Sequence, residues 1–223
     1  MKQIGYYPGY STLAQKDFWD DATRAVVLKR LEPPAPLRFF GPGEAERLEA
    51  VVNQILPQDD RPAERRIAIV PELDKRLYEH RGPGYRYADM PPDGEAYRMG
   101  LRAIEEIAQH LFGAEFLYLR NRERDQVLFT LHDGEPPAAK AIFARMSVKH
   151  FWLMLVNDVA EVYYAHPWAW DEIGFGGPAY PRGYMRLERG EPEPWEKPEQ
   201  RYEWAAPEDS LSGECRPLPG SHL

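Results

Sequence analysis

Cysteine is almost absent from this chain of 223 residues, in which Cys215 is the only one. A single thiol can form neither an intrachain disulfide nor a multi-thiolate metal site, and Cys215 does not stand in a Cys-x-x-Cys-His haem attachment sequence. Redox cofactors held by cysteine are therefore excluded on this chain.

Basic residues are in the minority as well. Lys and Arg number 28 against 36 Asp and Glu, so the formal net charge is −8 and the pI is near 5.4. Binding to a phosphate backbone requires a concentrated basic face, and no Lys/Arg cluster supplies one. Nucleic acid is therefore not an expected partner.

Long apolar runs are missing too. The longest, residues 151–156, is far shorter than the roughly 20 residues that a membrane-spanning helix needs, so we interpret it as a core segment. The first residues lack the basic start, apolar stretch and cleavage site of a secretory signal, and they contain no twin arginine. From the sequence as written, we expect a cytoplasmic location.

Motifs for self-contained chemistry are also scarce. The chain has no phosphate-binding Gly-x-x-x-x-Gly-Lys-Ser/Thr, no Gly-x-Gly-x-x-Gly after a strand and no Gly-x-Ser-x-Gly. Glu106 and His110 stand four residues apart, but the second motif of a di-iron helical bundle is absent. Asp59 and Asp60 are adjacent and point apart, which favours a helix-stop role after Pro57. We therefore predict no cofactor and no metal on this chain.

What the sequence does contain is apolar residues at helical spacing. Only residues 116–119 (FLYL) resemble a strand, so the predicted fold class is all-α: an irregular helical bundle with a long aromatic, Gly- and Pro-rich loop and an extended C-terminal arm. The last helix is apolar all round its middle and should be the most buried element. The predicted helices cover about residues 22–31, 44–56, 71–80, 97–111, 123–131 and 136–163.

Residues 163–184 (YYAHPWAWDEIGFGGPAYPRGY) combine aromatics, glycines and prolines at a density that argues against a helix. One interpretation is a loop folded back on the core of its own domain. The other is a docking surface for another protein, since Trp and Tyr often dominate binding energy. His166 is either a hydrogen-bonding loop residue or a general base with Tyr163 or Asp171 nearby.

We predict three parts: an N-terminal arm (1–36), a helical domain (37–184) and an acidic, Pro-rich tail (185–223). The tail carries −4 of the net charge. It is interpreted either as a solvated segment or, because Trp195, Tyr202 and Trp204 are costly to expose, as an arm packed along this domain or a partner.

The pattern as a whole resembles the gluconate 2-dehydrogenase subunit 3 family. The residues that carry the resemblance are Phe39-Phe40, Glu44, Leu48, Val51-Val52, Ile55-Leu56-Pro57-x-Asp59-Asp60, Val70-Pro71, Leu73-Asp74, Tyr97, Gly100, Leu101, Phe143, Trp170-x-x-Ile173-Gly174-Phe175-x-Gly177-Pro178 and Gly183-Tyr184. They span roughly residues 39–184, and neither the arm nor the tail is covered.

The resemblance implies a non-catalytic small subunit that binds and stabilises or matures a large FAD-dependent dehydrogenase of the glucose-methanol-choline type. In such complexes the large chain carries FAD and oxidises a sugar, sugar acid or polyol, and a cytochrome c often accepts the electrons. Many members carry a twin-arginine signal that this sequence lacks, so a periplasmic location would require a partner that supplies the signal. The residues expected to bind the partner are Trp170, Gly174, Phe175, Gly177, Pro178, Tyr180, Gly183 and Tyr184.

Two other functions stay open from the sequence. A stand-alone enzyme would use a cleft around His166. A module that binds a small molecule such as a sugar would be stabilised by its ligand through mass action.

Overall fold

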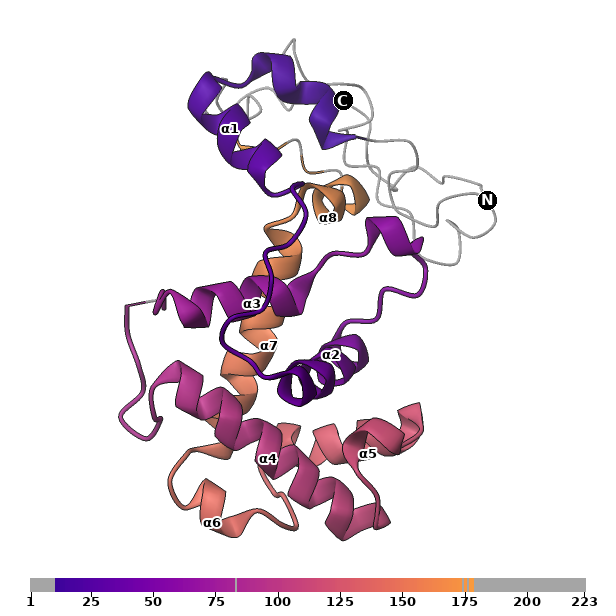
Figure 1. The fold of residues 1–223 in the computed structure, drawn as a ribbon, viewed down its shortest axis with the longest axis vertical. Helices are drawn as coiled ribbons and strands as arrows, with labels where there is room; N and C mark the ends of the chain where they lie inside the picture. The colour runs from indigo at the N-terminus through magenta and orange to yellow at the C-terminus, as the bar shows by residue number, and fades with distance from the viewer. Residues whose placement is uncertain (1–10, 83, 174, 176, 179–223) are drawn as a thin grey trace, which may run out of the picture. The chain divides into compact units, whose positions relative to one another are not determined.

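The computed structural model describes residues 11–82, 84–173, 175, 177 and 178, and every regular element in this part of the chain is helical (Figure 1). The prediction of an all-α fold is confirmed. Residues 185–223, the predicted tail, lie outside the described part. The elements are η1 (Thr12–Phe18), α1 (Asp21–Lys29), α2 (Pro42–Ile55), η2 (Ala63–Arg65), α3 (Ile69–Tyr78), α4 (Asp93–Phe112), η3 (Phe116–Tyr118), α5 (Asn121–His132), α6 (Lys140–Phe143), α7 (Val148–Tyr164) and α8 (Pro167–Glu172).

The chain divides into two compact units. Unit 1 comprises Met1–Pro33, Pro62–Ile67 and Tyr163–Leu223, and unit 2 comprises Pro34–Arg61 and Ala68–Val162. Unit 1 is thus assembled from separated pieces of chain. The linear division into 1–36, 37–184 and 185–223 stays a prediction.

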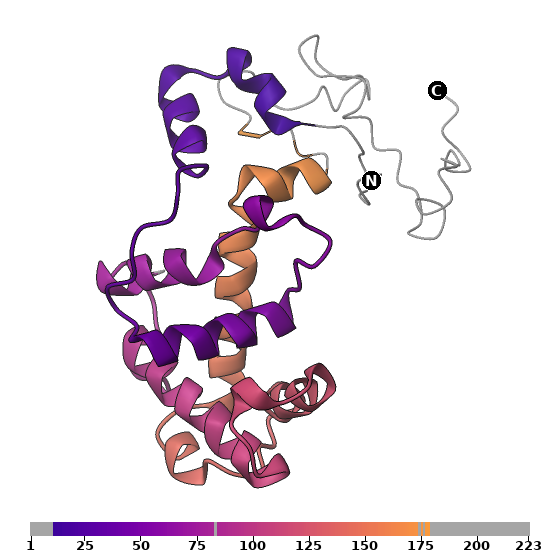
Figure 2. The same cartoon turned by 45° about the vertical axis from the view of Figure 1, so that its right-hand side comes forward.

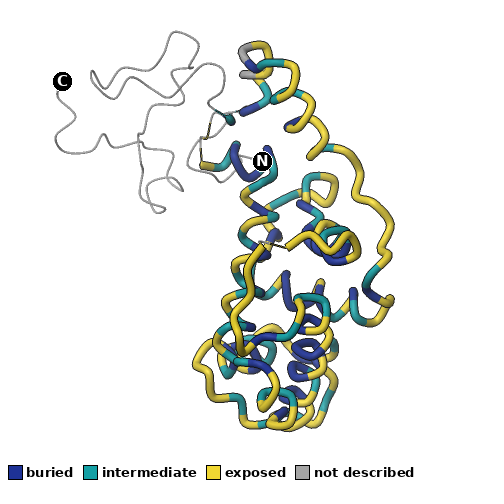
Figure 3. Tube along the Cα trace, turned by 90° about the vertical axis from the view of Figure 1, so that its left-hand side faces the viewer, coloured by how far each residue is buried: buried dark blue, intermediate teal, exposed yellow. Residues whose placement is uncertain are grey.

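Unit 2 is a bundle in which α2 packs against α3, α4 and α5, and α4 and α5 lie side by side (Figures 1 and 2). The helices form where the apolar spacing predicts them, because one stripe of each can be buried while the rest faces water. Buried residues recur at intervals along these helices, between exposed ones (Figure 3). They include Leu48, Val51 and Val52 of α2, Leu73 and Leu77 of α3, Tyr97, Leu101, Ile104 and Ala108 of α4, and Val127, Leu128 and Leu131 of α5.

Gly100 of α4 lies directly against the ring of Phe151 in α7, and both residues are buried. A Cβ atom at position 100 would overlap that ring. The absence of a side chain therefore lets α7 approach α4 closely, which accounts for a glycine in the middle of a helix despite its low helix propensity.

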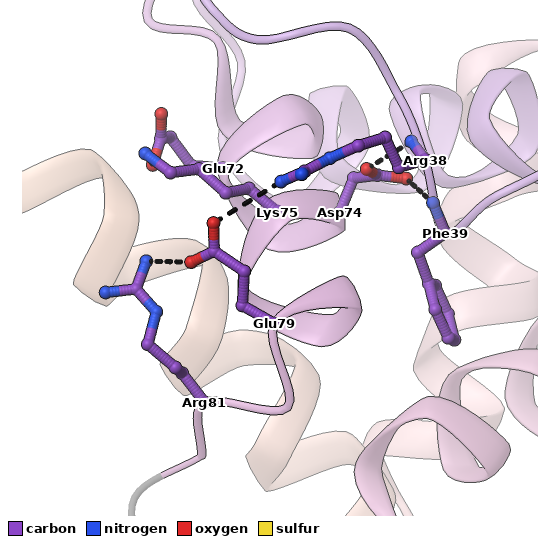
Figure 4. Close-up of polar contacts among 7 residues, drawn as sticks. All are labelled: Arg38, Phe39, Glu72, Asp74, Lys75, Glu79 and Arg81. Atoms are coloured by element: carbon purple, nitrogen blue, oxygen red, sulfur yellow. Dashed lines mark hydrogen bonds and ion pairs between the residues drawn. The ribbon is translucent and has the colours of Figure 1, made fainter.

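Asp74 is a buried carboxylate that holds the chain entering α2. It is 1% exposed and accepts hydrogen bonds from the backbone N–H groups of Arg38 (2.7 Å), Phe39 (2.9 Å) and Phe40 (2.8 Å). Figure 4 shows Arg38 and Phe39 converging on Asp74. A buried carboxylate is stable only when hydrogen bonds replace its lost hydration, and here three backbone donors do so.

Around this buried group lies an exposed ion-pair chain. Glu79 contacts Arg38 at 3.3 Å and Arg81 at 2.6 Å (Figure 4). The Arg38 guanidinium also lies 4.1 Å from the centre of the Tyr78 ring. Because these charges are partly in water, each pair stabilises the fold only weakly.

The prediction of one long helix over 136–163 is wrong. The segment forms the short α6 and the separate α7, with residues 144–147 between them. The Ser147 hydroxyl accepts from the amide of His150 at 3.3 Å, as an N-cap serine does, and the Ser147 amide donates to the carbonyl of Asp89 at 3.1 Å. Side-chain capping therefore starts a new helix at this point.

Two finer predictions are also wrong. In the middle of α7 only Phe151 and Leu155 are buried, and Leu153 is 38% exposed, so this helix is amphipathic despite its composition. The strand-like residues 116–119 form η3 instead, where Phe116 is buried and Tyr118 is exposed. Three residues without a neighbouring strand have no ladder to join, and a 3-10 turn pairs the backbone locally.

Among the described residues, no helix combines the length and the apolar character needed to span a membrane.

Candidate functional site

The candidate site lies in unit 1, at the described part of the aromatic segment. Its core consists of Trp19, Val27 and Trp170, with Leu13 packed against them. Trp170 comes from α8, a helix that the sequence argued against. It forms because Pro167 occupies the first turn, where no amide donor is needed, and the Nδ1 atom of His166 accepts from the amide of Trp168 at 3.2 Å.

Thr12, close to the first described residue, holds the C-terminal part of the aromatic segment through two hydrogen bonds. The amide of Thr12 donates to Asp171 Oδ1 at 2.7 Å, and the hydroxyl of Thr12 donates to the carbonyl of Phe175 at 2.8 Å. Arg65 of η2 adds an ion pair with Asp171 at 3.4 Å. Thr12 is fully buried, so these contacts tie Asp171 of α8 and the carbonyl of Phe175 to one buried residue.

Gly177 is a position where glycine is required. Its φ is +84°, a conformation that L side chains rarely adopt, and a Cβ atom there would lie 2.9 Å from the Trp19 ring and 3.2 Å from Thr12 Cγ2. The sequence predicted that glycines in this segment allow positive φ or close backbone approach. Both are found at Gly177.

The side chains proposed for a stand-alone enzyme have structural partners. His166 caps α8, the Tyr163 hydroxyl donates to Glu172 at 2.8 Å, and Asp171 binds Thr12 and Arg65. These contacts hold the segment in shape.

The residues expected to bind a partner differ in exposure. Trp170 is only 5% exposed and its indole N–H donates to the carbonyl of Tyr164, whereas the ring of Phe175 is 42% exposed and meets Trp170 edge-on at 5.4 Å. Gly177 is buried and Pro178 is partly exposed. Gly174, Tyr180, Gly183 and Tyr184 lie outside the described residues, and the partner-binding role of the whole set stays a prediction.

The residues expected to bind a partner did not include Tyr164, Ile173 or Arg30. Tyr164 and Ile173 are 50% and 45% exposed, although both are large and apolar in part. Arg30 places its guanidinium 5.4 Å from the centre of the Trp170 ring and donates to the carbonyl of Ala165 at 2.6 Å. We define Arg30, Tyr164, Trp170 and Phe175 as the Trp170 patch. No sequence motif pointed to Arg30, because its partner lies 135 residues further along the chain.

The charge of the Trp170 patch comes from Arg30. No described carboxylate pairs with this guanidinium, and partial withdrawal from water lowers the pKa of Arg30 below its ordinary value. A guanidinium offers five N–H donors, and among the described residues the hydrogen bond shown for this one goes to the carbonyl of Ala165. The patch therefore combines exposed aromatic rings with a positive charge that no carboxylate in the described part of the chain pairs.

The described residues contain no group of three or more His, Cys, Asp or Glu side chains placed to hold a metal ion. Glu106 and His110 both lie exposed on α4, and Asp59 and Asp60 lie exposed after α2. The structure thus assigns these four residues to surface positions.

Fold and site together define a helical protein whose aromatic segment is held at several points by other parts of unit 1. Residues 42–177 match the family model described as Gluconate 2-dehydrogenase subunit 3. Because this match covers more than half of the chain, the protein belongs to that family, whose members are subunits of a complex. No curated protein and no solved structure matches the chain.

Proposed function

We propose that this chain is the non-catalytic small subunit of an FAD-dependent sugar or polyol dehydrogenase of the glucose-methanol-choline type. In this proposal it binds the large subunit and stabilises it during maturation, and FAD is held by the large subunit. A cytochrome c is the proposed electron acceptor of the complex. The small subunit acts in the cytoplasm unless a signal on the large subunit exports the pair.

The observation that carries the proposal is the family match, which reaches from the start of α2 to Gly177 in the aromatic segment. The geometry at the end of the match supports a binding role. Phe175 and Tyr164 are exposed, while the backbone beneath Phe175 is tied to the buried Thr12. A partner that contacts such a surface does not have to order it first, which lowers the entropic cost of association.

The aromatic side chains of the segment differ in burial, and the proposal gives the buried and the exposed ones different roles. Trp170 is buried against Trp19 and Val27, so it holds the surface in place, whereas Phe175 and Tyr164 are available to touch a partner. We therefore propose Phe175 and Tyr164 as contact residues, and Trp170, Gly177 and Pro178 as residues that position them.

The test is purification of the tagged chain from its native cell, followed by an absorbance scan and identification of co-purifying chains. The proposal expects a stoichiometric large chain with flavin absorption. A colourless monomer with no partner would contradict it, and turnover of a sugar by the isolated chain would favour the enzyme alternative.

A variant series then tests the assigned surface. Co-expression of the large chain with Phe175→Ala should lower the yield of flavin-loaded complex, because loss of a contact aromatic at an interface often costs 2 kcal/mol or more, roughly 30-fold in affinity. Phe129→Ala in α5 is the matched control, since Phe129 is 60% exposed and belongs to unit 2. Equal yields for the two variants would remove Phe175 from the interface.

A further inference from the structure

We propose that the outer face of α7 joins two copies of this chain in an antiparallel dimer. We define the α7 face by Lys149, Trp152, Leu153, Val156 and Glu161. All five belong to unit 2, so the proposal needs no part of unit 1. It concerns the isolated chain and does not rest on the proposed function.

The first observation is that α7 leaves much of its apolar surface accessible. Residues 151–156 are all apolar, yet only Phe151 and Leu155 among them are buried. The other four are partly or largely accessible to water, and Leu153 is 38% exposed. A helix that is apolar all round is normally buried on every side, so α7 has a side that still lacks a neighbour.

The second observation is that this accessible surface lies on one side of the helix. Trp152, Leu153 and Val156 follow Lys149 at spacings of three, four and seven residues, which places them on one face. The ring of Trp152 meets His132 of α5 edge-on at 6.0 Å, and this contact restricts it. Less side-chain freedom is therefore lost when a partner covers the ring.

The third observation is the placement of charge. Asp158 is buried, so the exposed Lys, Asp and Glu side chains of α7 are Lys149 in its first turn and Glu161 in its last. The Glu161 side chain is 75% exposed. Position 161 lies twelve residues after position 149, about 18 Å along a helix, so the two charges cannot pair within one chain.

Both charges also oppose the dipole of their own helix. A helix favours acidic groups near its N-terminus and basic groups near its C-terminus, and α7 has the reverse. Beside an antiparallel second copy, Lys149 lies next to the C-terminal end of the other α7 and next to Glu161 of that copy. The arrangement that is unfavourable in one chain becomes favourable twice in the pair, which selects a second copy as the occupant.

The charges also set the register of the pair. In a two-fold dimer the same surface is used by both copies, so a contact from Lys149 to Glu161 is made twice. The two-fold axis then passes beside position 155, and Leu153 of each copy lies opposite Asn157 of the other. One face of a single helix gives a small interface, so the dimer should dissociate readily on dilution.

The experiment is sedimentation velocity of the isolated full chain. The fraction of dimer should rise between about 1 and 100 μM, as expected for a small interface. Glu161→Lys places lysine opposite lysine at both ends of the contact, and Lys149→Glu places glutamate opposite glutamate. Each variant should weaken the dimer by about tenfold or more, since like charges at an interface repel.

Mixing the two variants separates a charge effect from a folding defect. An equimolar mixture of Glu161→Lys and Lys149→Glu chains should form a heterodimer, because every charge in it again faces its opposite. The double variant Lys149→Glu/Glu161→Lys should recover self-association for the same reason. Glu135→Lys and Lys140→Glu reverse exposed charges elsewhere in unit 2 and should dimerise like wild type.

A wild-type chain that stays monomeric up to about 100 μM would overturn the proposal, because the fraction of dimer must rise with concentration. A dimer that neither reversal weakens would place the contact elsewhere and overturn it too. If wild type is monomeric and both reversals lower binding of a large chain, the α7 face serves that partner instead, and the dimer is wrong. No large chain is present in the sedimentation measurement, so failure of the proposed function leaves its outcome unchanged.

Discussion

The phenol hydroxyl of Tyr97 donates a 2.7 Å hydrogen bond to Asp158 inside unit 2. The same carboxylate accepts hydrogen bonds from both terminal nitrogens of the Arg76 guanidinium. Burial and the neighbouring charge of Asp158 raise the pKa of Tyr97 well above its ordinary value, so the phenol stays a hydrogen-bond donor. The three residues come from α4, α7 and α3, and the contact joins these helices.

We therefore expect Asp158→Ala to lower the free energy of unfolding by about 3–5 kcal/mol, since the largely buried Arg76 charge then loses its close partner and keeps only the exposed carboxylate of Glu161 at 4.0 Å. Tyr97→Phe removes one hydrogen bond and should cost only about 1 kcal/mol. Urea denaturation measures both. Equal losses would show that the ion pair adds nothing beyond the phenol contact.

Asp74→Ala should destabilise unit 2 by at least about 2 kcal/mol, because three backbone donors lose their acceptor and at least one of them is buried. Glu79→Ala, which removes an exposed carboxylate next to α3, is the control and should cost less than about 1 kcal/mol. Thermal unfolding of both variants checks the contrast. A small loss for Asp74→Ala would mean that water replaces the carboxylate.

Gly100→Ala should cost about 1–3 kcal/mol, because the added methyl group forces Phe151 away from α4. Phe151→Leu in the same chain should recover part of the loss. Gly43→Ala in α2 is the matched control, since nothing lies within 4 Å of its Cβ position, and it should be neutral or stabilising. The close approach of α4 and α7 would be in doubt if both alanine variants behaved alike in denaturant.

Gly177→Ala should open the end of the aromatic segment, since alanine there is strained at positive φ and meets Trp19. Faster amide exchange in residues 163–178 is the expected result. Gly113→Ala, the C-cap of α4, has φ +65° but no neighbour within 4 Å, and it should cost only the backbone term of about 1 kcal/mol. Normal exchange in the Gly177 variant would show that the segment adapts.

The stability of the fold should depend on pH through the carboxyl group of Asp89. The hydrogen bond from His150 lowers the pKa of Asp89 below its ordinary value of 3.8. Its stabilising effect is therefore complete above that value and is lost as the pH falls through the lower, folded-state pKa. Wild type should be more stable than Asp89→Asn at pH 6, and the difference between the two urea midpoints should shrink as the pH falls below 3.8. A difference that stays constant at every pH below that value would exclude Asp89 as the titrating group.

Much of the helical fold was predictable, because the apolar spacing that indicates a helix also marks the face that the helix buries. In α2 the apolar stripe of Leu48, Val51 and Val52 marks both the helix and its buried face. The break before α7 was not predictable from periodicity, since it depends on Ser147 meeting Asp89 from a distant loop. Leu153 is exposed for a similar reason: composition does not tell which side of an apolar helix finds a neighbour.

The candidate site was only partly predictable. The density of aromatics located the segment, and the glycines indicated tight backbone at Gly177. The roles of Trp170 and Phe175 could not be separated, because burial of Trp170 depends on Trp19 and Val27, which come from the other end of the chain. Arg30 joins the site by the same long-range packing.

Thr12 and Phe175 are 163 residues apart in sequence, yet the hydroxyl of one donates to the carbonyl of the other. During synthesis every residue of unit 2 leaves the ribosome before Phe175 does. Unit 2 can therefore fold before Thr12 of unit 1 can form its hydrogen bond to Phe175. The contact between Thr12 and Phe175 can therefore form only after all of unit 2 has been synthesised. The long-range packing of the aromatic segment is consequently a late step in the folding of the nascent chain.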